Sequence, residues 1–98
     1  MRSIARRAAV RQAYTVYILQ CGDGTLYTGI TTDLALRLKK HRAGTGARYT
    51  RSRGVERVLY TERRASRSAA LVREAAIKRL TRAQKLQLVG TGKMRKTS

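Results

Sequence analysis

Two short segments rich in β-branched and aromatic residues lie on either side of a glycine-containing turn. They are Tyr14 to Cys21 and Thr25 to Ile30, and Gly22-Asp23-Gly24 connects them. Such side chains favour extended backbone, whereas Gly and Asp accept the backbone angles of a tight turn. The sequence therefore predicts an antiparallel hairpin.

A helix and another strand are predicted after the hairpin. Residues 31–33 (Thr-Thr-Asp) offer capping oxygens for a helix over about residues 33–42, and Gly44 is placed to end that helix. Residues 55–62 contain Val, Leu and Tyr side chains that favour a third strand.

Two more helices are predicted in the last third of the chain. Ser66 or Ser68 is placed to cap the first of them, and Thr81 with Gln84 resembles a capping box for the second, which we expect to end near Val89. The predicted order is thus ββαβαα. We expect an α+β fold, a small three-stranded antiparallel sheet flanked by helices.

The length of 98 residues predicts a single domain. We expect a basic flexible arm over residues 1–13, the domain over 14–89 and a basic disordered tail over 90–98. One Cys and one His exclude an internal disulfide and a four-ligand structural zinc site. No apolar run approaches the ~20 residues that span a bilayer. We therefore expect a soluble protein of the cytoplasm, associated with the nucleoid if it binds DNA.

The charge of the chain points to a polyanionic partner. It has 23 Lys and Arg against 5 Asp and Glu, a net charge of +18 at pH 7. Such a charge costs stability through self-repulsion, and counterion release rewards many simultaneous phosphate contacts. Nucleic acid is the expected partner. The alternatives are a merely solvated basic surface and an anionic membrane surface.

The register of the hairpin decides whether two tyrosines meet. A three-residue turn that pairs Cys21 with Thr25 places Tyr17 opposite Gly29 and on the same face as Tyr27. A two-residue turn places the two phenols on opposite faces. Both tyrosines also fit an interpretation as core residues, with Gly29 simply covered by the ring across from it.

Three further polar side chains are candidates for a functional site. Arg37 and His41 lie one turn apart on the first predicted helix and project together. Glu74 falls within the apolar arc of the next helix, where a carboxylate needs a compensating charge. Either a divalent cation or an ordinary ion pair with Lys78, one turn later, meets that need.

A glycine-rich basic loop follows the first helix. The stretch from Gly44 to Tyr49 resembles a phosphate-contacting loop, although a Gly-x-Gly pattern alone is a weak signal. The residues expected to contact nucleic acid are Arg48, Tyr49, Arg51, Arg53 and Lys78.

The order and spacing of these residues resemble the GIY-YIG nuclease superfamily, in particular its short, stand-alone bacterial YhbQ-like branch. Thr15-Val16-Tyr17 stands where the family has Gly-Ile-Tyr, and Tyr27-Thr28-Gly29 where it has Tyr-Ile-Gly. Arg37 stands at the position of the family arginine, His41 one turn later, and Glu74 at the position of the metal-binding glutamate. The resemblance covers about residues 14–89.

The resemblance implies hydrolysis of a phosphodiester with a single Mg²⁺ or Mn²⁺ ion. Glu74 would hold the metal, and Arg37 would stabilise charge on the phosphoryl oxygens. Tyr17 is the candidate base, while Tyr27 and His41 would orient the water or relay the proton. The choice of base among these three stays open.

Two functions are compatible with this pattern. The first is a metal-dependent DNA endonuclease, structure-selective in repair or recombination. The second is a DNA- or RNA-binding domain on the same fold with weak or lost chemistry, because the chain contains no Asn whereas many family nucleases use one late in the domain. A basic RNA- or ribosome-associated protein is a third, less favoured interpretation.

Overall fold

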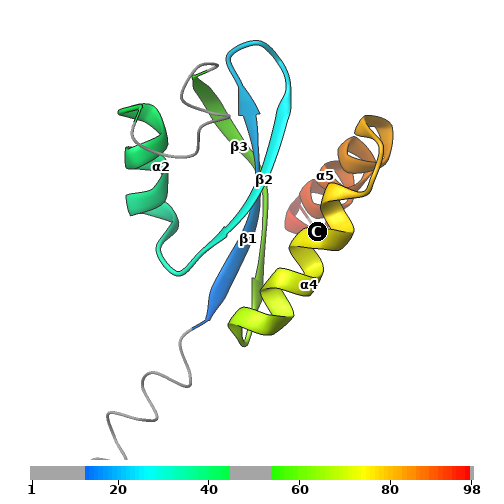
Figure 1. The fold of residues 1–98 in the computed structure, drawn as a ribbon. Coiled ribbons are helices and arrows are strands. Elements are labelled where there is room, and N and C mark those ends of the chain that lie inside the picture. The colour runs from blue at the N-terminus through cyan, green and yellow to red at the C-terminus, as the bar shows by residue number, and fades with distance from the viewer. Residues whose placement is uncertain (1–12, 45–53, 98) are drawn as a thin grey trace, which may run out of the picture.

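The computed structural model describes residues 13–44 and 54–97. These residues form the elements β1 (Tyr14–Cys21), β2 (Leu26–Thr31), α2 (Leu34–Arg42), β3 (Val55–Arg64), α4 (Arg67–Lys78) and α5 (Arg82–Thr97). The order ββαβαα and the α+β class are those predicted from the sequence (Figure 1).

The three strands form one antiparallel sheet with β1 in the centre. The strand order is β2-β1-β3. Tyr17 pairs with Gly29 and Leu19 with Tyr27, and the Cys21 amide donates to the Thr25 carbonyl at 2.8 Å. This is the register of the three-residue turn, so Tyr17 and Tyr27 share a face.

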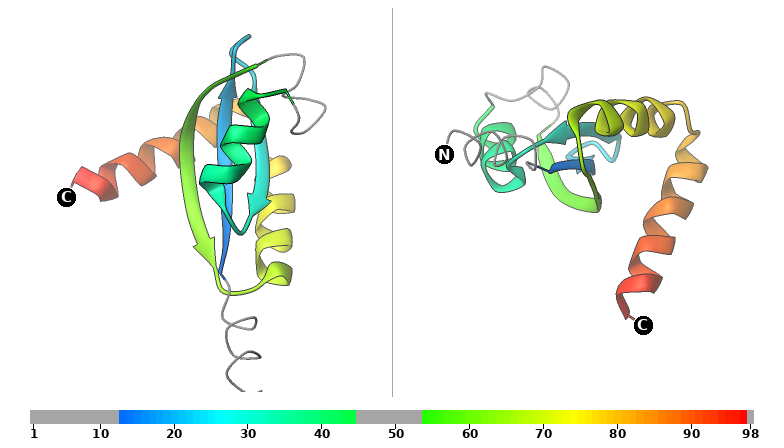
Figure 2. Two further views of the ribbon diagram at one scale, coloured as in Figure 1. Left: turned by 90° about the vertical axis from the view of Figure 1, so that its left-hand side faces the viewer. Right: turned by 90° about the horizontal axis from the view of Figure 1, so that it is seen from below.

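Helices cover both faces of the sheet. In the left view of Figure 2, α2 lies on the near side and α4 on the far side. Side chains alternate between the faces of a strand, so Val16 and Ile18 point toward α4 and α5. There they form the buried core with Tyr60, Ala70, Ile77 and Val89. Tyr17 and Leu19 point the other way, toward α2.

The predicted helix caps are confirmed. Asp33 accepts a hydrogen bond from the Leu36 amide at 3.0 Å, and Ser66, rather than Ser68, accepts one from the Ala69 amide at 3.1 Å. Thr81 and Gln84 exchange the two hydrogen bonds of a capping box at 2.9 and 3.1 Å. These caps satisfy amide groups that the first turn of each helix leaves unpaired.

Two element ends differ from expectation. β3 continues two residues beyond Glu62, where Arg64 pairs with Tyr14 of β1. α5 continues past Val89 to Thr97. Gly90 does not end this helix because it lacks the positive φ of a C-terminal glycine cap, and the Thr91 hydroxyl donates to the Gln87 carbonyl one turn back. The division into arm, domain and tail stays a prediction.

Among the described residues, the helices are all too short or too polar to cross a membrane.

Candidate active site

The site is built around the phenol of Tyr17, which lies over Gly29. Tyr17 is 1% exposed on the central strand. A Cβ at position 29 would lie 2.6 Å from the Tyr17 hydroxyl oxygen and 2.8 Å from its Cζ. Gly29 is therefore required by close approach: the strand opposite Tyr17 must have no side chain where the phenol lies.

His41 of α2 completes this contact from above the sheet. Its Nε2 lies 3.1 Å from the Tyr17 hydroxyl, and its ring is 1% exposed. The Tyr27 ring packs edge-on against the His41 ring, with centroids 5.5 Å apart, and it lies 6.3 Å from the Tyr17 ring. Three of the five predicted catalytic side chains thus form one cluster.

Arg37 stands one turn before His41 on α2 and supplies positive charge to the cluster. Its backbone amide donates to the Asp33 carbonyl in the first turn of the helix, and its side chain is half-buried. Its charge lowers the pKa of both Tyr17 and His41. The structure therefore brings Arg37 to the same site, as the sequence predicts.

Burial sets the protonation states of the two bonded groups. It raises the pKa of Tyr17 well above its usual value of 10.0; the neighbouring Tyr27 and Glu74 act in the same direction, and Arg37 opposes them. Burial, followed by the Arg37 charge, lowers the pKa of His41 below 6.5. Both groups are accordingly neutral at pH 7. The Arg37 charge does not overcome the burial of Tyr17, so a standing phenolate is disfavoured.

Glu74 lies on α4, which covers the face of the sheet opposite α2. Its side chain is 18% exposed, and its Oε2 lies 3.4 Å from the ammonium group of Lys78. The carboxylate also acts electrostatically on Tyr17. The ion pair with Lys78 that the helical spacing predicts is therefore present, and the carboxylate acts on Tyr17 through its charge.

Glu74 offers a divalent cation one carboxylate ligand. Among residues 13–44 and 54–97, no group of three or more His, Cys, Asp or Glu side chains could hold a metal ion. Mg²⁺ is commonly held by one or two carboxylates together with water and substrate phosphates. The donor set therefore suits an ion whose other ligands are water or phosphate oxygens, and it does not suit a preformed protein cage.

Of the five residues predicted to contact nucleic acid, the structure describes one, Lys78. Lys78 is 55% exposed beside Glu74. The expected contacts within residues 45–53 lie outside the described residues; they are Arg48, Tyr49, Arg51 and Arg53.

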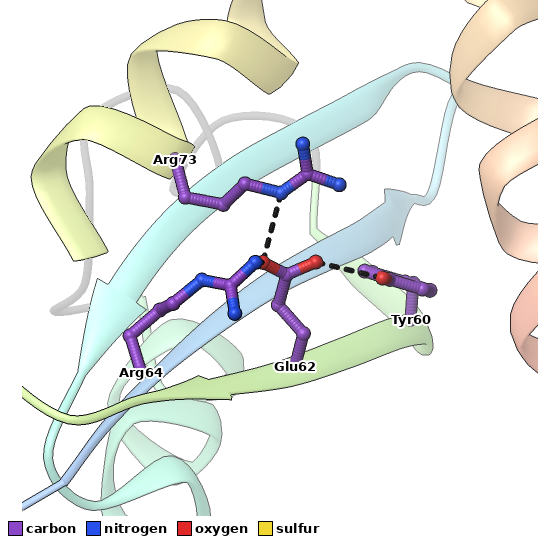
Figure 3. A network of polar contacts seen from close by, with 4 residues as sticks. All are labelled: Tyr60, Glu62, Arg64 and Arg73. Atoms are coloured by element: carbon purple, nitrogen blue, oxygen red, sulfur yellow. Dashed lines mark hydrogen bonds and ion pairs between the residues drawn. The ribbon is translucent and has the colours of Figure 1, made fainter. Parts of the chain in front are cut away.

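The structure adds a second polar cluster that the sequence analysis missed. Glu62 of β3 accepts a hydrogen bond from the Tyr60 hydroxyl at 2.7 Å and pairs with Arg73 and Arg64 at 2.8 and 2.6 Å (Figure 3). The available signal was strand alternation, which puts Tyr60 and Glu62 on the face that α4 covers. The distant partner Arg73 had no local signal.

Known proteins resemble this chain over most of its length. Residues 13–87 match the family described as the GIY-YIG catalytic domain. The UPF0213 protein of Streptococcus sanguinis is 53% identical over 74 residues, which are 76% of this chain and 85% of that protein. A UPF0213 protein of Desulfotalea psychrophila is 50% identical over 90 residues, 91% of this chain and 82% of the relative.

Solved structures share the fold. The solution NMR structure of a UPF0213 protein from Bacillus halodurans superposes with a TM-score of 0.53 at 47% identity, and that of a protein from E. faecalis with 0.57 at 45%. Each alignment covers 81% of this chain and 84% of the other. These relatives are short proteins, and the present chain spans most of their length.

Proposed function

Because this chain belongs to the GIY-YIG catalytic-domain family, in its short stand-alone branch, we propose that it is a metal-dependent endonuclease that hydrolyses DNA phosphodiester bonds. The family implies a nucleic acid as substrate. We further propose DNA over RNA, and structure-selective cleavage in repair or recombination. One observation carries the proposal: the buried Tyr17 hydroxyl lies 3.1 Å from His41 Nε2 with the Arg37 charge beside them.

The Tyr17–His41 pair supplies a route for the proton of the attacking water. In the neutral tautomer of His41 that carries its proton on Nδ1, Nε2 accepts a hydrogen bond from the Tyr17 hydroxyl. As Tyr17 accepts the water proton on its oxygen, it passes its own proton to Nε2. Tyr17 thus remains a neutral phenol throughout, which agrees with the raised pKa that burial gives it. His41 is the final proton acceptor.

Arg37 and Glu74 act on the phosphate. Arg37 stabilises the negative charge that grows on the phosphoryl oxygens as the water attacks. Glu74 would hold Mg²⁺ or Mn²⁺, and a bound ion there supplies Lewis-acid polarisation of the phosphate and charge neutralisation at the leaving oxygen. Lys78, which pairs with Glu74 in the structure, then becomes free to contact a neighbouring phosphate.

The test is a cleavage assay on linear, nicked, flapped and branched DNA and on matched RNA at low salt. Wild type is compared with Glu74→Ala and with Glu56→Ala, which removes an exposed carboxylate of β3. We expect products that require Mg²⁺ or Mn²⁺, that persist in Glu56→Ala and that vanish in Glu74→Ala while DNA binding remains. Cleavage that survives in Glu74→Ala, or that proceeds in EDTA, contradicts the proposal.

A nucleic-acid-binding domain without efficient chemistry is the second candidate. The Lys78–Glu74 pair favours it, because a carboxylate that keeps an ammonium partner is a poorer metal ligand. The absence of Asn from the chain points the same way. This candidate predicts metal-independent binding and intact substrates throughout the same panel.

A further inference from the structure

Glu62 joins β3 to α4 through a fully partnered carboxylate. Its side chain is 11% exposed; one oxygen accepts from Tyr60, and the other lies between the guanidinium groups of Arg73 and Arg64 (Figure 3). These partners hold the pKa of Glu62 below its usual value although burial opposes them. The carboxylate is therefore charged at neutral pH and binds α4 by an ion pair.

The partner on α4 is the residue immediately before Glu74. An α-helix turns by about 100° per residue. Relative to Ala70, which is fully buried against the sheet, Arg73 lies about 60° to one side and Glu74 about 40° to the other. Arg73 therefore faces β3, whereas Glu74 is directed to the opposite side of the line along which α4 packs.

This placement couples the Glu62 contact to the orientation of Glu74. Ala70 and Ile77 lie on nearly the same line along α4, and both are buried against the sheet. Their packing therefore sets how far the helix lies from the sheet, but it restrains rotation of the helix about its own axis less strongly. The Glu62–Arg73 pair acts away from that line, where it opposes such rotation. A rotation that releases Arg73 from β3 moves Glu74 relative to Tyr17.

We propose that Glu62 is a positioning residue for the metal site, which acts through Arg73 to hold the Glu74 carboxylate in place. This inference rests on the proposed role of Glu74. The inference adds a residue of β3, which lies on the side of α4 opposite Glu74. The hydrogen bonds and ion pairs that the structure records for Glu62 join it to Tyr60, Arg64 and Arg73, and not to Glu74 or the Tyr17 cluster.

The test uses Mn²⁺ as the probe and backbone NMR signals as the readout. Paramagnetic broadening of the Glu74 amide signal is followed during a Mn²⁺ titration of wild type, Glu62→Gln, Glu74→Ala and the double variant. Glu56→Gln is the matched control, because it removes an equal charge from the same strand at an exposed position. Thermal melting of each variant is recorded alongside.

We expect Glu62→Gln to raise the half-maximal Mn²⁺ concentration about 10-fold or more, the usual effect of removing a group that orients a metal ligand. Glu56→Gln should change it less than about 2-fold. In the Glu74→Ala background, Glu62→Gln should have no further effect, because no ligand remains to be oriented. A merely structural role for Glu62 would not produce this dependence on Glu74.

The outcomes separate the two proposals. If wild type shows no broadening, or Glu74→Ala broadens like wild type, then the metal site fails and the positioning role fails with it. If Glu74→Ala abolishes broadening but Glu62→Gln behaves like Glu56→Gln, then only the positioning role is refuted. Should Glu62→Gln be unfolded at the assay temperature, Arg73→Gln replaces it, because it removes the charge that pairs with Glu62. An unchanged Mn²⁺ titration in that variant overturns the proposal.

Discussion

Gly29→Ala should damage both stability and the proposed chemistry. The added Cβ would lie 2.6 Å from the Tyr17 hydroxyl oxygen, 2.8 Å from its Cζ and 3.1 Å from Cε2 of Tyr27. Ordinary contact begins near 3.4 Å, so the phenol must move by about 0.8 Å. Because Tyr17 is 1% exposed and packed on all sides, this movement displaces it from His41.

The magnitude follows from overpacking in a buried site. Forcing a group into a packed core costs about 1–3 kcal/mol, and a weakened hydrogen bond to His41 adds about 0.5–1.5 kcal/mol. Ala has less conformational entropy than Gly in the unfolded chain, and this difference offsets about 0.4–1 kcal/mol of the destabilisation. We expect net destabilisation of about 1–3 kcal/mol, which lowers the melting temperature of a domain this size by about 5 °C or more.

The assay is urea and thermal denaturation of Gly29→Ala beside Gly90→Ala. Gly90 is helical, and no neighbouring atom lies within 4 Å of its added Cβ, so the same substitution there should stabilise the protein by about 0.5–1 kcal/mol. Opposite signs at the two positions support the close approach of Tyr17 to Gly29. A neutral or stabilising effect of Gly29→Ala would refute this packing argument.

Three further predictions follow from the charges and caps. Because the pKa of His41 is lower in the folded than in the unfolded chain, the unfolded chain binds a proton at higher pH, and the free energy of unfolding should fall as the pH drops through 6.5. The chain has no other His, so His41→Gln should remove this pH dependence. If urea titrations of His41→Gln and wild type give the same pH dependence, this prediction is contradicted. Ser66→Ala should destabilise α4 by about 0.5–2 kcal/mol, measured by denaturation, whereas Ser68→Ala should cost less because Ser66 is the residue that caps the helix; equal costs would refute that assignment. The logarithm of the DNA association constant should fall with log salt by about 0.9 per phosphate contacted, and a slope near zero would argue against phosphate binding by this basic chain.

Local signals in the sequence were sufficient for most of the fold. The strand segments, the Asp33 and Ser66 caps and the Thr81–Gln84 capping box depend on neighbours within a few residues, and each lies where the pattern puts it. The predicted end of α5 near Val89 was wrong, because a glycine such as Gly90 can either cap a helix or continue one. Its backbone angles, and not its identity, decide between them.

The candidate site was predictable only as far as spacing and register allow. The alternation of β1 and β2 predicts that Tyr17, Gly29 and Tyr27 share a face once the turn length is known, and the structure supplies that length. The contact of Tyr17 with His41 joins residues 24 positions apart, and that of Glu62 with Arg73 joins a strand to the next helix. Such contacts depend on how the helices pack, which no local pattern contains.

Single-turnover cleavage by Tyr17→Phe, with DNA affinity measured in parallel, tests the central claim most directly. In the proposed relay, the substitution removes the oxygen that passes the water proton to His41, and it leaves the ring in place. Tyr14→Phe on the same strand, whose side chain packs against the opposite core, is the control. The account predicts a loss of about 10²–10⁴-fold in the cleavage rate with unchanged DNA affinity for Tyr17→Phe, and a wild-type rate for Tyr14→Phe. Cleavage by Tyr17→Phe at the wild-type rate would contradict the proton relay and the active site built on it.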